Sequence, residues 1–457
     1  MLPGPRDSGE SKLNTQDPLE QARGFLDRGE PARAKEIYLA LLLRDRYDHD
    51  AMLGLADVFV ASEDFESARI VLTQAVARHA TSSAAHNALG GVSLELNDLD
   101  AAREAFLISL RENPLQRKAW AGLGVVFERT GDLEAADRAW HEAFRDGGPA
   151  VSTYRGTQEP VRVLLLRSAV DGNIPLRAVL DDRIFVWITL FVESFHEGMM
   201  LPPHSVVFNL VGNADLRTRA LDKAEAVLRA TTAPVINHPS RVRETGRAQI
   251  ADRLRDIPGI VTPRMLVRVR GAFEEDPGLG WPLLVRSLGF HTGEHFVKID
   301  DPSNVRAAVA ELPGEELLAI EYLDTRDDDG LYRKYRVLTI DGQLYPLHLA
   351  VSREWKVHYF TADHNAASRA QERAFLESME SAIGGDAATA LQRAARALDF
   401  EYGGIDFGID RLRRVVVFEA NPTMAIVPPT KQPDDAYRRS AIERAIDATR
   451  AMIRKTG

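Results

Sequence analysis

Three oxygen-bearing side chains near the carboxyl end of the chain have a spacing that suits a divalent cation. Two strand-like runs, 404–410 and 415–422, are separated by a short basic turn. An antiparallel hairpin would bring Asp406 of the first run close to Glu419 and Asn421 of the second. Magnesium binds carboxylate and amide oxygens and takes its remaining ligands from water and phosphate. The pattern therefore favours a nucleotide-phosphate site, and it leaves open an amphipathic hairpin with solvated acids.

The alternation of side chains along a strand gives this hairpin two faces. Residues two apart on a strand point to the same side of the sheet. Glu419 and Asn421 are therefore expected on one face, and Phe418 and Ala420 on the opposite face.

Four segments upstream follow an order that supports the phosphate site. They are a buried strand that ends in Arg286, a Gly-bearing turn at 287–293, an apolar run with an acid at 317–323, and a basic strand at 334–342. Together with the hairpin, this order resembles the ATP-grasp superfamily. It is similar in particular to carboxylate-amine ligases such as glutathione synthetases, D-alanyl-D-alanine ligases and the ligase that adds glutamates to a ribosomal protein. The resemblance covers about residues 160–430.

The resemblance implies a site for ATP and two magnesium ions. The implied metal ligands are Asp406, Glu419 and Asn421. The implied nucleotide-binding residues are the phosphate cations Arg247 and Arg286, the loop glycines Gly289 and Gly293, and the adenine hinge with its ribose contact, Glu321, Tyr322, Leu323 and Asp324. The implied catalytic cations are Arg353, which would lie over the reacting carboxyl group, and Lys334 and Arg336 beside it.

The family resemblance also implies a reaction. ATP would phosphorylate a small-molecule or peptide carboxylate, and an amine would then displace phosphate to form an amide. Two departures keep an alternative open: the phosphate loop is short, at 289–295, and Arg286 stands where the family usually has lysine. The alternative is a nucleotide-binding scaffold protein with a degenerate, non-catalytic ATP-grasp region. His291 and His295 of the short loop are expected to be ordinary polar residues or aids to phosphate binding.

The first third of the chain repeats itself every 34 residues. Small and large residues recur at this step in matching places, for example Ala34, Ala68, Ala102 and Ala136. A fixed period of this length resembles tetratricopeptide repeats, with small residues where two helices press together. The pattern predicts four units, 15–48, 49–82, 83–116 and 117–150. Such arrays offer a groove for peptides or proteins, so the repeats imply a peptide or protein partner.

A segment rich in Gly, Pro, Ser and Thr follows the repeats and reads as a linker. Beyond it, apolar runs at 161–166, 205–211 and 234–237, with a helical stretch at 216–230, predict an open parallel sheet. Polar residues follow the strand ends, and Asn173, Asn209 and Asn213 are either substrate contacts or turn residues.

The predicted fold is multidomain, an all-α tetratricopeptide-repeat solenoid followed by an α/β preliminary domain and an α+β ATP-grasp fold. The expected divisions are a polar tail at 1–14, four repeats at 15–150, a linker at 151–160, the preliminary domain at 161–240 and the ATP-grasp domain at 241–457.

Composition limits the classes of partner, of catalytic chemistry and of cellular location that we expect for this chain. The formal net charge is −10, which argues against nucleic acid as a partner. The chain has no cysteine, so thiol catalysis and disulfides are excluded. The amino terminus lacks the apolar core of a signal peptide, and the nine-residue apolar run 184–192 is too short for a membrane span. We therefore expect a cytoplasmic protein without a membrane partner.

Overall fold

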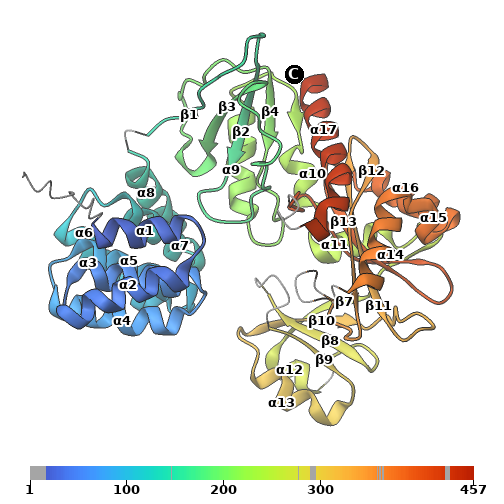
Figure 1. Cartoon of the computed structure of the whole chain (residues 1–457), viewed down its shortest axis with the longest axis horizontal. Helices are drawn as coiled ribbons and strands as arrows, with labels where there is room; N and C mark the ends of the chain where they lie inside the picture. Colours follow the sequence, from blue (N-terminus) through green and yellow to red (C-terminus); the bar gives the residue numbers. More distant parts are fainter. Residues whose placement is uncertain are drawn as a thin grey trace, which may run out of the picture. The chain divides into compact units, whose positions relative to one another are not determined.

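The computed structural model of the 457-residue chain divides into two compact units, Met1–Gly147 and Gly148–Gly457 (Figure 1). It describes residues 17–145, 147–275, 277–288, 295–357, 359, 362, 365–427 and 433–457. Each unit is described by itself.

Antiparallel helix pairs build the first unit. The pairs are α1 (Pro18–Asp27) with α2 (Pro31–Arg44), α3 (His49–Ala61) with α4 (Phe65–Arg78), α5 (Ser83–Glu95) with α6 (Leu99–Glu112), and α7 (Arg117–Thr130) with α8 (Leu133–Ala143). The aspartates that recur at the 34-residue step begin the second helices. The side chains of Asp64, Asp98 and Asp132 each accept a hydrogen bond from a backbone N–H of the first turn of α4, α6 and α8.

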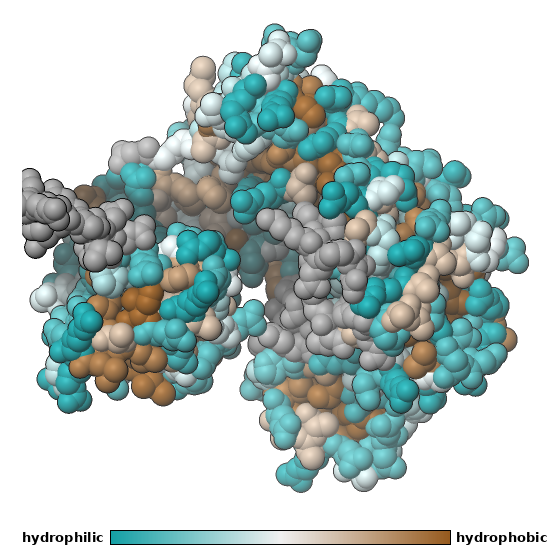
Figure 2. All heavy atoms as spheres, viewed as in Figure 1, coloured by the Kyte–Doolittle hydropathy of each residue, from teal (hydrophilic) through white to brown (hydrophobic). Residues whose placement is uncertain are grey.

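Large side chains lie against glycines of neighbouring helices, both within a repeat and between adjacent repeats. A Cβ atom on Gly54 would lie 2.2 Å from the ring of Tyr38, and one on Gly124 would lie 2.6 Å from Trp140. The four alanines of the repeat are completely buried. The expected pairing of small and large residues between helices is thus present. The outer surface still carries apolar side chains among charged ones (Figure 2), including Leu43 of α2 and Ile70 of α4.

Two adjacent glycines in α5 allow a matched test of this packing. A Cβ on Gly90 would lie 2.6 Å from the ring of Phe106, whereas one on Gly91 would meet nothing within 4 Å. We expect Gly91→Ala to stabilise the repeat unit by up to about 1 kcal/mol through helix propensity. Gly90→Ala should destabilise it by about 1–3 kcal/mol, because the ring must move. Chemical denaturation of both variants checks this, and equal effects would contradict the packing argument.

A mostly parallel sheet opens the second unit. Its strand order is β1 (Ala150–Val151), β3 (Phe185–Phe191), β2 (Val161–Arg167), β4 (Val206–Asn209) and β5 (Val235–Ile236), and β1 alone runs antiparallel to its neighbour. Alternate residues of β2 enter different cores. Leu164 packs in a core that includes residues of α9 (Thr218–Leu228), and Val163 in one that includes residues of α17 (Arg439–Thr456). The β2 run is continuously apolar because both faces are covered.

Two antiparallel sheets complete the second unit. The small sheet has the order β7 (Met265–Val269), β10 (Glu316–Glu321), β8 (Leu283–Ser287) and β9 (Phe296–Ile299), and it packs on α12 (Arg270–Glu275) and α13 (Val305–Ala310). The large sheet has the order β12 (Gln343–Ser352), β11 (Tyr332–Ile340), β13 (Tyr402–Ile409), β14 (Val415–Asn421) and β6 (Ile260–Val261). Only the β14–β6 pair of the large sheet is parallel.

Helices cover one face of the large sheet. The remaining helices of the unit are α10 (Pro239–Arg243), α11 (Arg247–Leu254), α14 (Ala366–Glu377), α15 (Met379–Ile383) and α16 (Gly385–Ala397), with short 3₁₀ turns at Val192–Ser194, Pro302–Asn304 and Pro433–Arg438. Tyr335 and Val337 of β11 pack in the core that α11, α14 and α16 form.

The opposite face of the large sheet changes character along β11. Leu338 and Ile340 enter the core that also holds residues of α17, whereas Lys334 and Arg336 lie outside that core and are charged. The same division occurs on β13, between Tyr402 and Asp406. One half of this face is therefore structural, and the other half is free to form a polar site.

These elements confirm the predicted fold class, an all-α repeat unit followed by α/β and α+β sheets. Within the described residues, no helix combines the length and apolar character that crossing a membrane requires. The division of the second unit at residue 240 stays a prediction.

The segment expected as a linker is part of the first sheet. β1 pairs with Thr189 and Ile188 of β3, and the backbone N–H of Ser152 donates to the carbonyl of Trp187 at 2.9 Å. Arg155 forms a two-point ion pair with Asp182. A polar composition predicted a free connection, but edge-strand pairing satisfies this backbone instead, so the second unit begins at Gly148.

The edge strand gives a testable boundary. A fragment of residues 148–457 should fold, whereas a fragment of residues 161–457 should unfold at a lower temperature, because it exposes the hydrogen-bonding edge of β3. Thermal unfolding of both fragments checks this. Arg155→Ala in the longer fragment is the control and should change little, since its ion pair is exposed. Equal melting temperatures for the two fragments would show that residues 148–160 do not stabilise the sheet, as expected for a linker.

Candidate functional site

The β13–β14 hairpin places Asp406 directly opposite Glu419, and Gly404 opposite Asn421. The hairpin predicted from sequence is thus present. A β-bulge follows this pair, because the next partner of Phe407 is Val417. Phe418 is the extra residue and lines the same cavities as Glu419, so the expectation that it points into the opposite face was wrong. The bulge breaks the strict alternation on which that expectation rested. Ala420 is buried in the core as expected.

Asp406 is the buried centre of the charged cluster. Its side chain has no exposed surface, and the guanidinium of Arg336 bonds both of its oxygens, at 2.6 and 2.8 Å. The ammonium of Lys334 lies 2.7 Å from Oδ2. Burial acts to raise the pKa of Asp406, but the charges of Lys334 and Arg336 outweigh it and hold that pKa well below its usual range. Asp406 therefore stays ionised.

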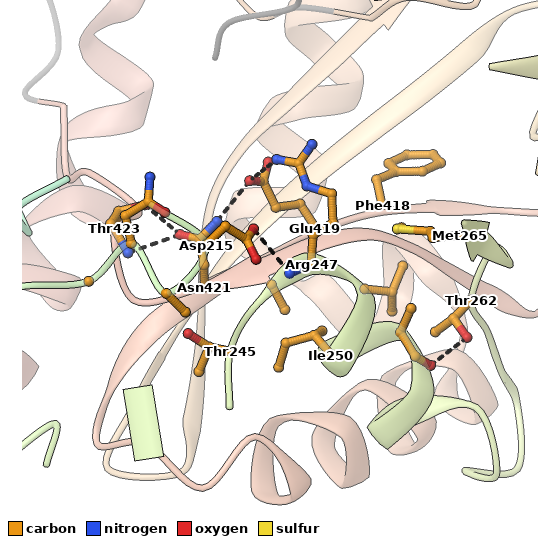
Figure 3. A pocket seen from close by; sticks show the side chains of 16 residues that line it. Asp215, Thr245, Arg247, Ile250, Thr262, Met265, Phe418, Glu419, Asn421 and Thr423 are labelled. Atoms are coloured by element: carbon orange, nitrogen blue, oxygen red, sulfur yellow. Dashed lines mark hydrogen bonds and ion pairs between the residues drawn. The ribbon is translucent and has the colours of Figure 1, made fainter. Parts of the chain in front are cut away.

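Glu419 and Asn421 form the second half of the cluster (Figure 3). The Oε1 atom of Glu419 accepts hydrogen bonds from Nη2 of Arg247 and from Nδ2 of Asn421, both at 2.9 Å. The Oδ1 atom of Asn421 accepts from the backbone N–H and the hydroxyl of Thr423, at 2.9 and 2.7 Å. Asn421 therefore turns its nitrogen, not its oxygen, toward Glu419.

Two carboxylates and an amide on a rigid hairpin suit a hard divalent cation. Asp406, Glu419 and Asn421 fit magnesium by the chemistry of their donor atoms, once the cations beside them move. No group of three or more His, Asp or Glu side chains in the described parts of the chain could hold a metal ion, and this cluster brings together two carboxylates and an amide.

A cavity of about 500 Å³ lies beside the cluster, between the small sheet and the large sheet. Its volume is within the range of small-molecule sites. Its lining includes the apolar side chains of Met265, Leu284, Ile320 and Leu323 and the cations Arg247, Arg286, Lys334 and Arg336. The cavity thus combines a surface for a flat apolar ring with cations for an anionic group.

A smaller crevice of about 50 Å³ adjoins this cavity (Figure 3). Arg247 and Glu419 line both spaces, so their ion pair forms part of the wall between them. Asp215, from the loop after β4, lines the crevice and accepts a hydrogen bond from the backbone N–H of Arg247. The first sheet thereby contributes a carboxylate near the hairpin.

Three of the four residues of the predicted hinge, 321–324, line the cavity. Glu321, Tyr322 and Leu323 line it, and the Glu321 carboxylate accepts a hydrogen bond from the backbone N–H of Arg264 at 3.0 Å. Asp324 is absent from the lining and is bonded to Arg326. The backbone N–H of Glu321 also donates to the carbonyl of Arg264 at 2.9 Å, so both the backbone and the carboxylate of Glu321 hold β10 to the start of β7.

The structure does not bring Arg353 to the predicted place. Its side chain is exposed and lines neither cavity, whereas Trp355 and Lys356 of the same loop line the larger one. β12 ends at Ser352, and continued alternation would have placed Arg353 on the face of Leu349 and Val351, which pack in the helix-covered core, and not on the charged face of Arg336 and His348. The geometry favours Arg336 for the role given to Arg353. Gly289, Gly293 and His291 lie outside the described residues.

Sequence reasoning missed an aromatic wall of the cavity. The ring of Trp355 meets the ring of Phe296 edge to face, with centroids 5.2 Å apart, and the Arg286 guanidinium lies 5.5 Å from the centroid of Phe296. A tryptophan two residues after Arg353 was the available signal. His348, opposite Arg336 on β12, was also missed; burial, and then the charge of Arg336, lowers its pKa well below the usual range.

The asparagines after the parallel strands bond the local backbone. Asn173 accepts from the N–H of Ser168, Asn209 from that of Val211, and Asn213 from that of Leu216, at 2.8–3.1 Å. This geometry favours turn residues over substrate contacts.

A family model described as tetratricopeptide repeat matches residues 19–85, 53–114 and 87–150. Residues 19–150 are tetratricopeptide repeats. This part is similar to the solved structure of MamA from Desulfovibrio magneticus RS-1, with 20% identity over 28% of this chain and 75% of that chain and a TM-score of 0.26.

The chain is also similar to two larger solved structures. The first is a RimK domain protein ATP-grasp from Sphaerobacter thermophilus, with 14% identity over 64% of this chain and 98% of that one and a TM-score of 0.40. The second is the VanG D-Ala:D-Ser ligase from Enterococcus faecalis, with 13% identity over 64% and 100% and a TM-score of 0.39. No curated protein matches the chain.

The buried position of Asp406 predicts a stability effect. Asp406→Asn leaves Lys334 and Arg336 without their counter-charge and should destabilise the second unit by roughly 3–5 kcal/mol near neutral pH. Since folding lowers the pKa of Asp406, its contribution is present above the unfolded pKa of about 3.9 and is lost as pH falls.

Denaturation of wild type and variant in metal-free buffer, from pH 7 down to pH 3, measures this difference. The gap in unfolding free energy should narrow below about pH 4. Asp341→Asn, which removes an exposed partner of Lys455, is the control and should change little. A variant as stable as wild type at pH 7 would contradict the assigned pairing.

Proposed function

We propose that the second unit is an ATP-dependent carboxylate-amine ligase that forms an amide bond through an acyl phosphate. The observation that carries the proposal is the 500 Å³ cavity, lined by both apolar side chains and cations, beside the paired Asp406 and Glu419. The order of motifs along the chain, which resembles the ATP-grasp superfamily, supports the same conclusion.

The two kinds of residue that line the cavity suit the two parts of ATP, its flat adenine ring and its charged phosphates. The adenine ring would lie on the apolar side chains, and backbone groups at Glu321–Leu323 would meet its edge. Arg247, Arg286, Lys334 and Arg336 would bind the phosphate oxygens, and the two-point geometry of guanidinium suits phosphate. Magnesium held by Asp406, Glu419 and Asn421 would offset phosphate charge.

The chemistry requires two displacements. A carboxylate oxygen of the substrate attacks the γ-phosphorus, and the bond from that phosphorus to ADP breaks. An amine then attacks the carbonyl carbon of the acyl phosphate, phosphate leaves, and the amine loses a proton. Phosphoryl transfer depends mostly on positioning and charge stabilisation, which the cations supply. Arg336 is our choice for the cation that would contact both the γ-phosphate and the carboxylate that attacks it, since it lies on β11 beside Lys334 and lines the cavity.

The repeats are proposed to recruit a peptide or protein partner, which would present the carboxylate or the amine. Tetratricopeptide repeats commonly bind peptides in their groove. The alternative function is a scaffold protein that binds nucleotide without turnover, and the ion pairs that already engage Asp406 and Glu419 favour it.

Product analysis separates these functions. We expect the purified chain with ATP, magnesium and a mixture of amino acids and peptides to release ADP and phosphate, and hydroxylamine to trap the acyl phosphate as a hydroxamate. Arg336→Ala should reduce hydroxamate formation about a hundredfold or more, as expected for the loss of a preorganised donor.

Arg353→Ala is the matched control, an exposed arginine that should leave the rate nearly unchanged. Release of AMP and pyrophosphate would mean adenylation instead. Nucleotide binding without any release of ADP would support the scaffold function.

A further inference from the structure

The oxygens of Asp406 are fully engaged by protein cations. The Arg336 guanidinium spans Oδ1 and Oδ2, and the Lys334 ammonium adds a contact to Oδ2. The carboxylate is completely buried, so these bonds are shielded from water. A divalent cation can therefore bind Asp406 only if one of these cations yields its position.

Glu419 and Asn421 also have protein partners that must move before a metal ion can bind. Arg247 and the Asn421 amide both bond one oxygen of Glu419, and Thr423 engages the Asn421 oxygen with two hydrogen bonds. For Asn421 to offer its oxygen to a metal, those contacts must open or be shared.

The charge of the cluster disfavours a free metal ion. Lys334, Arg336 and Arg247 bring three positive charges to the two negative charges of Asp406 and Glu419, so the cluster is net positive. All three cations also line the 500 Å³ cavity. Phosphate oxygens that enter this cavity offer them new partners, and the carboxylate oxygens then become available.

We propose that Lys334, together with Arg336 and Arg247, makes this site accept a divalent cation only in company with a polyphosphate. The inference rests on the proposed nucleotide function and names the form of the ligand, the metal–nucleotide complex. Lys334 sets the selectivity, because its single ammonium on a flexible stem contacts one oxygen and leaves more readily than the two-point Arg336. By linkage, metal and nucleotide each raise the affinity of the other.

The first test uses the wild-type chain and Mn²⁺ as the probe. Electron paramagnetic resonance measures free Mn²⁺ with the chain alone, with a non-hydrolysable ATP analogue alone, and with both, because the analogue binds Mn²⁺ by itself. We expect no tight binding to the chain alone, more Mn²⁺ bound with both than with the analogue alone, and the loss of that excess in Glu419→Gln. This readout requires no turnover.

The second test changes Lys334. Lys334→Met should raise the affinity for Mn²⁺ alone about tenfold and lower the affinity for the analogue, because the carboxylate loses a competing partner and the phosphates lose a cation. Lys455→Met, which removes a lysine from an exposed ion pair with Asp341, should alter neither affinity. Thermal unfolding checks that each variant is folded, and the wild-type measurement stands if Lys334→Met is not.

The outcomes distinguish two failures. In the first, the wild-type chain binds Mn²⁺ equally well without the analogue, at a site that Glu419→Gln removes. That result would contradict the proposed selectivity for a metal–nucleotide complex and would leave the proposed nucleotide function intact. Failure of the analogue to bind with or without Mn²⁺ overturns the proposed function itself.

Discussion

A buried carboxylate at the centre of the large sheet is the constraint on which the site depends. Asp406 has no contact with solvent, and such a charge is tolerated only when cations and hydrogen bonds compensate it. Lys334 and Arg336 supply that compensation from the neighbouring strand, which fixes the register of β11 against β13. The same two cations also line the 500 Å³ cavity. Asp406, Lys334 and Arg336 therefore stabilise the pairing of β11 with β13 and also form the charged part of the candidate site.

The remaining architecture separates this polar half of the sheet from its apolar half. Leu338 and Tyr402 continue the faces of β11 and β13 into the core that α17 shares. Because that core is closed, the charged half is the part left to face the small sheet, whose Leu284 and Ile320 supply the apolar wall. The cavity is thus a consequence of two sheets that each devote one face to helices and leave the other face for a ligand.

The repeats are held together by contacts between residues that are close in the sequence. Each contact between a large side chain and a glycine, such as Trp140 on Gly124, lies within one short stretch of chain, and the pattern recurs at a fixed interval. Short-range packing of this kind makes each repeat depend mainly on its neighbours. A module of this type can be joined to an enzyme without sharing its core, and its family assignment follows from sequence alone.

The sequence by itself determined the elements and their pairings that depend on local pattern: the helical repeats, the parallel strands, and the hairpin that opposes Asp406 to Glu419. Only the tertiary structure decided which side chains reach the cavity. The bulge turned Phe418 toward the cavities, the loop after β12 left Arg353 exposed, and Ala150–Val151, at the start of the expected linker, formed an edge strand. It also decided that the proposed metal ligands are engaged by Lys334, Arg336 and Arg247. These features arise from contacts between residues far apart in the chain, and periodicity along one segment carries no information about such contacts.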